Sequence, residues 1–310
     1  MATTTTAPPA TSAAAPFPQT PAPARRRRID ATYVLFLVPA LLCFTVAITV
    51  PALLGVFYSF TNSVGFGDYE MVGLTNYLAL FDDPAIIGAY AFTIGFAFIT
   101  VIATNAVAFM LAVGLTAQIR ARVALRAIFV MPMVISGIVI AYVFNFLFSN
   151  TLPALGQLLG LDPLESSLLA NPDLAWISIV FVTAWQATPS AMLIYIAGLM
   201  AIPYELYEAS SLDGASAFGQ LKAVTLPLMV GYIGINMILG FKNFLGAYDI
   251  IVGLTNGGPG VATRSIAMTI FTGFERGDYA YQMANATIFF IISLVIAIFQ
   301  LRLTSKGEAK

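Results

Sequence analysis

The sequence contains no histidine and only one cysteine, Cys43, among its 310 residues. Without histidine, Ser/His and Cys/His catalytic pairs and histidine-based metal sites are excluded, and a single cysteine cannot form a disulfide within the chain. Charge is also scarce, since 9% of the residues are charged, against about a quarter in a soluble domain. The residues therefore provide no believable catalytic set and no metal site, and we expect a protein that is not an enzyme.

Apolar residues are abundant instead. They make up 59% of the chain, and the mean hydropathy is +0.88. Runs of about 20 apolar residues suffice to cross a bilayer, and such runs occupy 33–58, 88–116, 127–149, 174–200, 229–254 and 282–303. We predict an all-α integral membrane protein with six transmembrane helices. The net charge of −1 and the scattered basic residues argue against nucleic acid as a partner.

The basic residues predict the orientation of these spans. If the N-terminus is cytoplasmic, eleven of the 14 Lys and Arg residues lie in cytoplasmic segments, as the positive-inside rule requires. Both termini are then cytoplasmic. Residues 1–28 read as a disordered Thr/Pro/Ala tail followed by an Arg cluster, residues 29–305 as the transmembrane domain, and residues 306–310 as a cytoplasmic tail. A cleaved signal peptide is disfavoured because the first apolar run exceeds a typical h-region.

The stretch "YELYEASSLDGASAFGQLKAVTLP", residues 204–227, is a polar segment between the fourth and fifth spans. Leu206, Ala209 and Leu212 form an apolar stripe on a predicted helix. The Asp213-Gly214 pair predicts a turn, and a second short helix follows before Pro227. One interpretation is a connector on the membrane surface. The other is a functional element, because connections in helical bundles usually have about 2–8 residues.

The spacing of this loop resembles the EAA motif of ABC importer permeases, which reads Glu-Ala-Ala, three residues, Gly, nine residues, Ile, one residue, Leu-Pro. Glu208, Ala209 and Ser210 precede Gly214 at that spacing, and Val224, Leu226 and Pro227 complete it, with two conservative departures. "GLTNYLALFDDP" at 73–84 and "LTNGGPG" at 254–260 look like outer-loop signatures of the carbohydrate branch, similar to the maltose-type and glycerol-phosphate-type permeases.

The resemblance implies a type I ABC importer permease bundle whose loop 201–228 is a coupling helix seated on a separate ATPase. It implies ATPase-coupling roles for six residues: Glu208, Ala209, Ser210, Asp213, Gly214 and Ala215. The chain has no GxxxxGK[ST] loop, so it binds no cofactor itself, and ATP and Mg belong to the partner.

The implied partners are a second permease subunit in a heterodimer, two ATPase subunits and an extracytoplasmic solute-binding protein, in a bacterial cytoplasmic membrane. The expected function is sugar import. Glycerol phosphate or a polyol is the alternative solute, and an ion-coupled secondary carrier is the rival class, although the sequence shows no convincing internal repeat.

Polar groups in the fourth and fifth spans are candidates for the solute path: Trp185, Gln186, Thr188, Asn243, Tyr248 and Asp249. Amide, hydroxyl, carboxylate and ring groups together suit a sugar, whose hydroxyls need paired donors and acceptors and whose C–H faces stack on aromatic rings. Lys242 and Asp249 lie seven residues apart, on one face of a continuous helix. Packing of Trp185 and Tyr248, snorkelling of Lys242, and solute binding by the partner permease alone remain alternatives.

Overall fold

The computed structural model describes residues 31–117 and 121–308, which are almost entirely helical, as predicted. They fall into two compact units, and the division lies between Pro51 and Ala52 in the sequence. The expected tail at 1–28, Arg120 and the last residues of the expected C-terminal tail, 309–310, lie outside the described residues.

Six helices in the described part of the chain are long and apolar enough to cross a membrane. They span Val34–Tyr58, Pro84–Thr116, Gly137–Leu159, Pro172–Ala201, Ala217–Leu245 and Tyr279–Arg302. The prediction of six spans is therefore confirmed. The first, second, fourth and sixth agree closely with the apolar runs, whereas the third and fifth begin and end at different residues.

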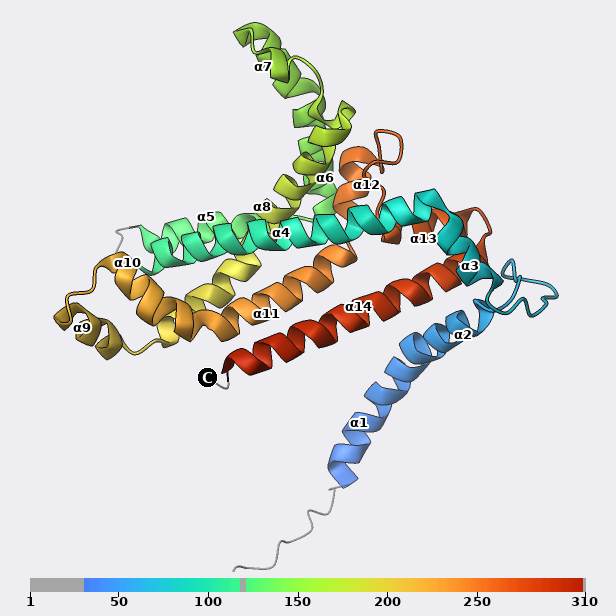
Figure 1. The fold of residues 1–310 in the computed structure, drawn as a ribbon, viewed down its shortest axis with the longest axis horizontal. Helices are drawn as coiled ribbons and strands as arrows, with labels where there is room; N and C mark the ends of the chain where they lie inside the picture. The colour runs from blue at the N-terminus through green and yellow to red at the C-terminus, as the bar shows by residue number, and fades with distance from the viewer. Residues whose placement is uncertain (1–30, 118–120, 309–310) are drawn as a thin grey trace, which may run out of the picture. The chain divides into compact units, whose positions relative to one another are not determined.

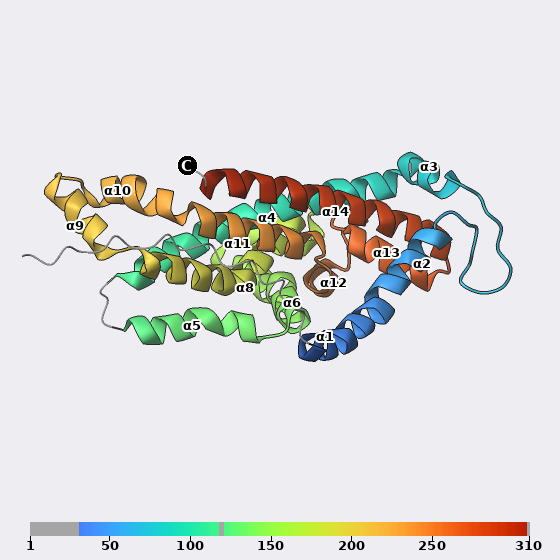
Figure 2. The same cartoon turned by 90° about the horizontal axis from the view of Figure 1, so that it is seen from below.

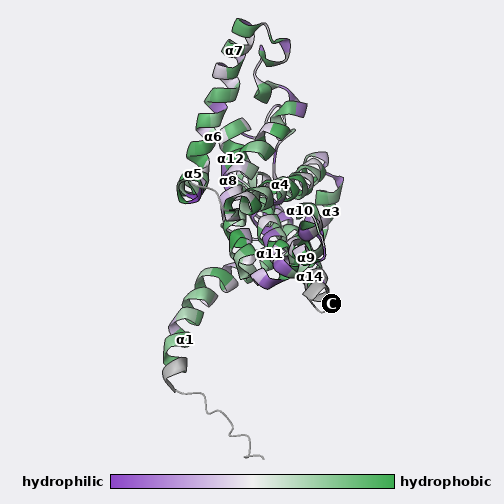
Figure 3. Ribbon diagram, turned by 90° about the vertical axis from the view of Figure 1, so that its left-hand side faces the viewer, coloured by the Kyte–Doolittle hydropathy of each residue, from purple (hydrophilic) through white to green (hydrophobic). Residues whose placement is uncertain are grey.

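The first span consists of α1 (Ala31–Phe44), a π-helical turn (Thr45–Thr49) and α2 (Val50–Tyr58). Its large apolar side chains from Val34 to Val50 are exposed, and Figure 3 shows hydrophobic colour along α1. A helix that is apolar all round is stable in an apolar environment, so the composition of this element suits a membrane span.

Four long helices form the centre of the second unit: α4 (Pro84–Thr116), α8 (Pro172–Ala201), α11 (Leu226–Leu245) and α14 (Tyr279–Glu308). α4 contacts α8 and α11, and α11 contacts α14 (Figures 1 and 2). Alanines at the α4 interface, including Ala97, Ala108 and Ala112, are fully buried. Small residues allow such close approach between membrane helices.

The remaining helices lie around this centre. At the end of the unit labelled by α3 in Figure 1 lie α3 (Thr75–Asp82) and α13 (Ile266–Glu275), and at the other end lie α9 (Tyr204–Leu212) and α10 (Ala217–Gln220). Two short 3₁₀ turns, Asp162–Leu164 and Leu168–Ala170, connect to α8. Each end of the unit therefore carries its own pair of short helices.

The predicted continuous helix over 127–149 is wrong. The chain forms α5 (Arg122–Val134), two extended residues at Ile135 and Ser136, and then α6 (Gly137–Phe146), which continues through a π-helical turn into α7 (Leu152–Leu159). Pro132 has no backbone N–H to donate to the helix, and Ile135 donates only to the Pro132 carbonyl. The helix ends there, and the third span runs further, to Leu159.

The predicted fifth span, 229–254, is also wrong at both ends. The second short helix expected in the loop is the start of the span, because α10 continues through the turn Leu221–Thr225 into α11. The span then stops at Leu245, and α12 (Asp249–Thr255) begins after a break at 246–248. Lys242 and Asp249 therefore do not share a helix, which corrects the expectation that they occupy one face.

The segments beyond the two breaks are joined to each other. α12 packs against α6, and Asn145 Nδ2 donates a hydrogen bond to the Leu254 carbonyl at 2.6 Å. A Cβ on Gly253 would lie 2.5 Å from the Ala141 Cβ, closer than carbon atoms pack. Glycine at this position therefore allows α6 and α12 to cross closely.

Gly253→Ala is expected to lower the thermal unfolding midpoint of the purified protein, because overpacking a tight contact costs about 1–3 kcal/mol. Gly95→Ala is the matched control, since Gly95 lies in α4 with nothing within 4 Å of an added Cβ. That variant should match or exceed the wild type, because alanine is the better helix former. Equal midpoints for the two variants would show that the α6–α12 crossing tolerates extra volume.

Candidate functional site: a polar cavity and an exposed loop

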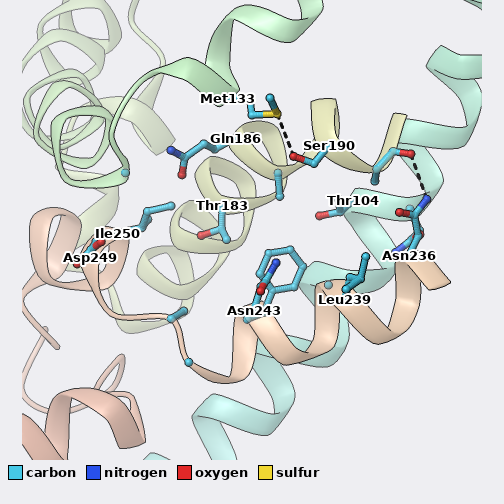
Figure 4. Close-up of a pocket in the computed structure, with 18 of the residues that line it drawn as sticks. Thr104, Met133, Thr183, Gln186, Ser190, Asn236, Leu239, Asn243, Asp249 and Ile250 are labelled. Atoms are coloured by element: carbon cyan, nitrogen blue, oxygen red, sulfur yellow. Dashed lines mark hydrogen bonds between the residues drawn. The ribbon is translucent and has the colours of Figure 1, made fainter. Parts of the chain in front are cut away.

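A cavity of about 520 Å³ lies among α4, α8, α11 and the two helix breaks (Figure 4). α8 contributes Thr183, Gln186 and Ser190 to its wall, and α11 contributes Asn236 and Asn243. Met133 and Gly137 line it from the first break, and residues 246–250 line it from the second. The breaks that apolar runs did not predict are thus part of the cavity wall.

Most of the polar side chains in this wall are uncharged hydrogen-bonding groups, set among apolar residues. Four amide side chains are present, with four hydroxyls and one carboxylate, and no lysine or arginine is among the residues that line it: Asn105, Gln186, Asn236, Asn243, Thr104, Thr183, Ser190, Tyr248 and Asp249. Amides supply both donors and acceptors, and hydroxyls supply either. Such a wall can satisfy a ligand rich in hydroxyl groups.

Two hydroxyls in the wall are buried without a hydrogen-bond partner among the described residues. Thr104 is 3% exposed and Thr183 is 5% exposed. Thr188 on the same helix as Thr183 instead donates to the Ala184 carbonyl at 2.7 Å. The two hydroxyl oxygens have almost no accessible surface. An unsatisfied buried polar group costs about 1–3 kcal/mol, so a group that enters the cavity and reaches these hydroxyls would gain hydrogen bonds that the wall leaves unmade.

Other polar groups hold the wall in place. Tyr195 donates from its hydroxyl to Asn105 Oδ1, and Asn236 Nδ2 donates to the Ala191 carbonyl at 3.0 Å, linking α4, α8 and α11. At the first break, Gln186 Nε2 donates to the Ile135 carbonyl at 3.0 Å, which the helix end leaves free. The wall is therefore a connected hydrogen-bonded structure.

The structure brings four of the six predicted path residues together, since Gln186, Asn243, Tyr248 and Asp249 all line the cavity. Trp185 and Thr188 line a separate, mainly apolar cavity of about 730 Å³ bounded by α4, α5 and α8. Trp185 packs edge-on against Phe144, with the ring centroids 5.4 Å apart. These two residues therefore lie on a different face of α8 from Gln186.

The sequence reasoning missed Thr104, Asn105, Thr183, Ser190 and Asn236. A signal was present, because Thr183, Gln186 and Ser190 are spaced three and four apart, as are Asn236, Gly240 and Asn243, and all six line the cavity. Residues at this spacing share one face of a helix. A prediction based on polarity alone combined Gln186 with Trp185 and Thr188, which lie on a different face of α8.

The loop between the fourth and fifth spans contains a sharply terminated helix. α9 ends at Leu212, and Gly214 follows in a left-handed conformation with φ of +79°. Ala215 N–H donates to the Ser210 carbonyl and Gly214 N–H to the Ser211 carbonyl, both at 3.0 Å. This is the Schellman arrangement of a helix C-terminus, and it confirms a turn at Asp213-Gly214.

Side-chain hydrogen bonds connect the two arms of this bend. Tyr207 Oη and Thr225 Oγ1 are 3.0 Å apart, and Gln220 Nε2 donates to Ser211 Oγ at 2.7 Å. The tip is solvent-accessible: Leu212 is 89% exposed and Phe218 is 73% exposed. Glu208 and Ala209 are exposed, while Ser210 and Ala215 are half-buried. The loop is a braced projection with apolar side chains on its surface.

Residues 104–306 match the model of the family described as "Binding-protein-dependent transport system inner membrane component". The chain belongs to this family. The match includes the loop, the cavity and the last four spans. Members are transport subunits and not catalysts, and with six apolar helices this chain is a multi-pass membrane protein.

Curated relatives extend the likeness over most of the chain. The multiple sugar-binding transport system permease protein MsmF of Streptococcus mutans is 33% identical over 88% of this chain and 95% of its own. The probable starch degradation products transport system permease protein AmyD of Thermoanaerobacterium thermosulfurigenes is 32% identical over 90% and 95%. These relatives confirm the resemblance to sugar permeases of ABC importers.

A solved structure confirms the fold class. It is a bacterial alginate ABC transporter in complex with alginate pentasaccharide-bound periplasmic protein, and one of its chains matches with a TM-score of 0.74 at 20% identity, over 89% of this chain and 95% of that chain. At this level of identity the likeness is one of fold.

Proposed function

We propose that this chain is a permease subunit of an ATP-driven importer for a sugar and that the 520 Å³ cavity is part of the solute path. The observation that carries the proposal is the wall of amides and hydroxyls in the middle of apolar spans. Polar groups are costly inside a membrane and mark substrate pathways there. The sugar permeases among its relatives support the same solute class.

The loop 201–228 couples the permease to a separate ATPase in this account. Exposed Leu206 and Leu212 give α9 an apolar face that no described residue covers. Glu208 supplies a carboxylate for docking, and Ala209, Ser210 and Ala215 are small enough for a helix pressed into a groove. Asp213 and Gly214 form the bend. Hydrogen bonds across the bend allow it to transmit a rigid-body movement to α8 and α11.

The assembly requires further chains. We infer a second, distinct permease, two ATPase subunits that bind ATP and Mg, and an extracytoplasmic binding protein, the last supported by the family's description. Residues 29–305 form the permease domain in a bacterial cytoplasmic membrane, with both termini and the loop 201–228 in the cytoplasm. Arg122, Arg126 and Lys222 then lie on the cytoplasmic side, as the positive-inside rule requires.

Copurification tests this function. The tagged full chain, solubilised in mild detergent, is expected to bring down an ATPase and a second permease, and Glu208→Ala combined with Gly214→Glu is expected to lose the ATPase and keep the permease. A chain that purifies alone in both forms and still transports solute would instead support an ion-coupled carrier.

A further inference from the structure

The cavity is lined by an acidic residue but by no described basic residue. Asp249 is the only Asp, Glu, Lys or Arg among the described residues that line it. The basic residues nearest in sequence, Lys242 and Arg264, do not line the wall, and Lys242 is exposed elsewhere on α11. The cavity therefore presents one negative charge and no positive side chain in the described part of the chain.

Asp249 has a fixed place in this wall. It opens α12 directly after the break, and its neighbour Ile250 is buried in the main core cluster. The Tyr248 carbonyl accepts from Val252 N–H at 2.9 Å, and the Ala247 carbonyl accepts from Ser265 Oγ at 3.1 Å. In Figure 4, Asp249 and Asn236 lie at opposite sides of the group of lining residues. The carboxylate thus marks one end of the cavity.

Sites that bind phosphate or carboxylate ligands usually offer arginine or lysine, which pair with the anion by charge-assisted hydrogen bonds. Here the amides and hydroxyls can pair with neutral hydroxyls, while a second negative charge would meet Asp249. Asp249 is itself solvent-exposed, so water screens part of this repulsion, and the lack of a basic residue in the wall adds to the penalty for an anion. The wall consequently discriminates against an anion and accepts a neutral solute.

We propose that the cavity selects neutral polyhydroxylated solutes and that Asp249 is the residue that excludes anionic ones. This inference rests on the proposed function and narrows it, because it rejects glycerol phosphate, sugar phosphates and uronic acids as solutes. The inference also predicts that this chain differs in solute from the transporter that imports the acidic polysaccharide alginate, which it resembles in fold.

The test measures binding to the purified transporter by equilibrium dialysis, with the binding protein left out so that it imposes no selection. The probes are matched pairs: maltose and maltose 6′-phosphate, glucose and glucuronate, glycerol and glycerol 3-phosphate. The wild type is expected to bind the neutral member of a pair at least about tenfold more tightly. Asp249→Asn should narrow this preference, and Asp249→Lys should reverse it.

Asp173 provides the matched control. It is an exposed aspartate in the first turn of α8, and it does not line the cavity. Asp173→Lys changes the net charge as much as Asp249→Lys does and should leave the preference unchanged. Wild-type protein that binds the anionic members equally well, or an Asp249→Lys variant with an unchanged ratio, would overturn the inference and leave the proposed function standing. Binding of neither class would contradict both.

Discussion

Replacing Gly214 with glutamate is expected to abolish solute-driven ATP hydrolysis by the assembled transporter while leaving the chain inserted and folded. Gly214 has a φ of +79°, and an added Cβ would have no atom of the described residues within 4 Å. The left-handed conformation costs other residues about 1–2 kcal/mol, which is too little to unfold six spans. The effect is therefore expected at the docking surface, where strain and a new carboxylate alter the tip that the ATPase contacts.

Two control variants distinguish an effect on the backbone conformation at Gly214 from an effect on the docking surface. Gly214→Asn keeps a residue that tolerates the left-handed conformation, so it should retain the bend and part of the activity. Gly219→Ala adds a methyl group with only ordinary contacts to Ala215 and Ser216 and should behave as wild type. ATP hydrolysis and uptake are measured in proteoliposomes. Wild-type rates in Gly214→Glu would show that the loop is a surface connector.

Changing Thr104 and Thr183 together to valine is expected to weaken solute binding about 10- to 100-fold without destabilising the protein. Valine has nearly the shape of threonine, and each change removes a buried hydroxyl that has no partner among the described residues. Each hydrogen bond lost to the solute is worth about 0.5–1.5 kcal/mol. The KM for uptake should therefore rise, while the thermal midpoint without solute stays level or increases.

Thr100 gives an internal control for this experiment. Its hydroxyl is also buried without a partner in the described structure, yet it does not line the cavity and lies one turn from Thr104 on α4. Thr100→Val should leave KM unchanged. If Thr100→Val and the double variant raised KM equally, the hydroxyls would act on helix packing and the cavity would lose its assignment as the solute path.

Hydropathy predicted the spans well because the bilayer demands an apolar run of fixed length. It failed where the chain breaks a helix inside such a run. At Ile135 and Ser136 the freed carbonyl of Ile135 is satisfied by Gln186, a residue 51 positions away. At 246–248 the Ala247 carbonyl is satisfied by Ser265. These compensations are tertiary, so no local pattern reveals them, and the apolar residues continue across both breaks.

Only part of the candidate site was predicted, because the sequence does not show which side of a helix faces the cavity. Gln186 and Asn243 were predicted because polar residues in apolar spans are unusual, and both line the cavity. The coupling role of Glu208 to Ala215, predicted from the fixed spacing of the motif, stays a prediction. Thr183 and Asn236 were not predicted, whereas Thr188 was, although the Thr188 hydroxyl donates to the Ala184 carbonyl of its own helix. Only the packing of α4, α8 and α11 shows which of these residues face the cavity.

In the mechanism proposed above, this permease moves a neutral sugar only when a partner hydrolyses ATP. The decisive measurement is uptake of radiolabelled saccharides into proteoliposomes that contain the full assembly, with ATP or a non-hydrolysable analogue on the side of the ATPase. We predict accumulation of a neutral saccharide with ATP, none with the analogue, and none without the ATPase subunits. Accumulation driven by an ion gradient in the absence of ATP would contradict the account.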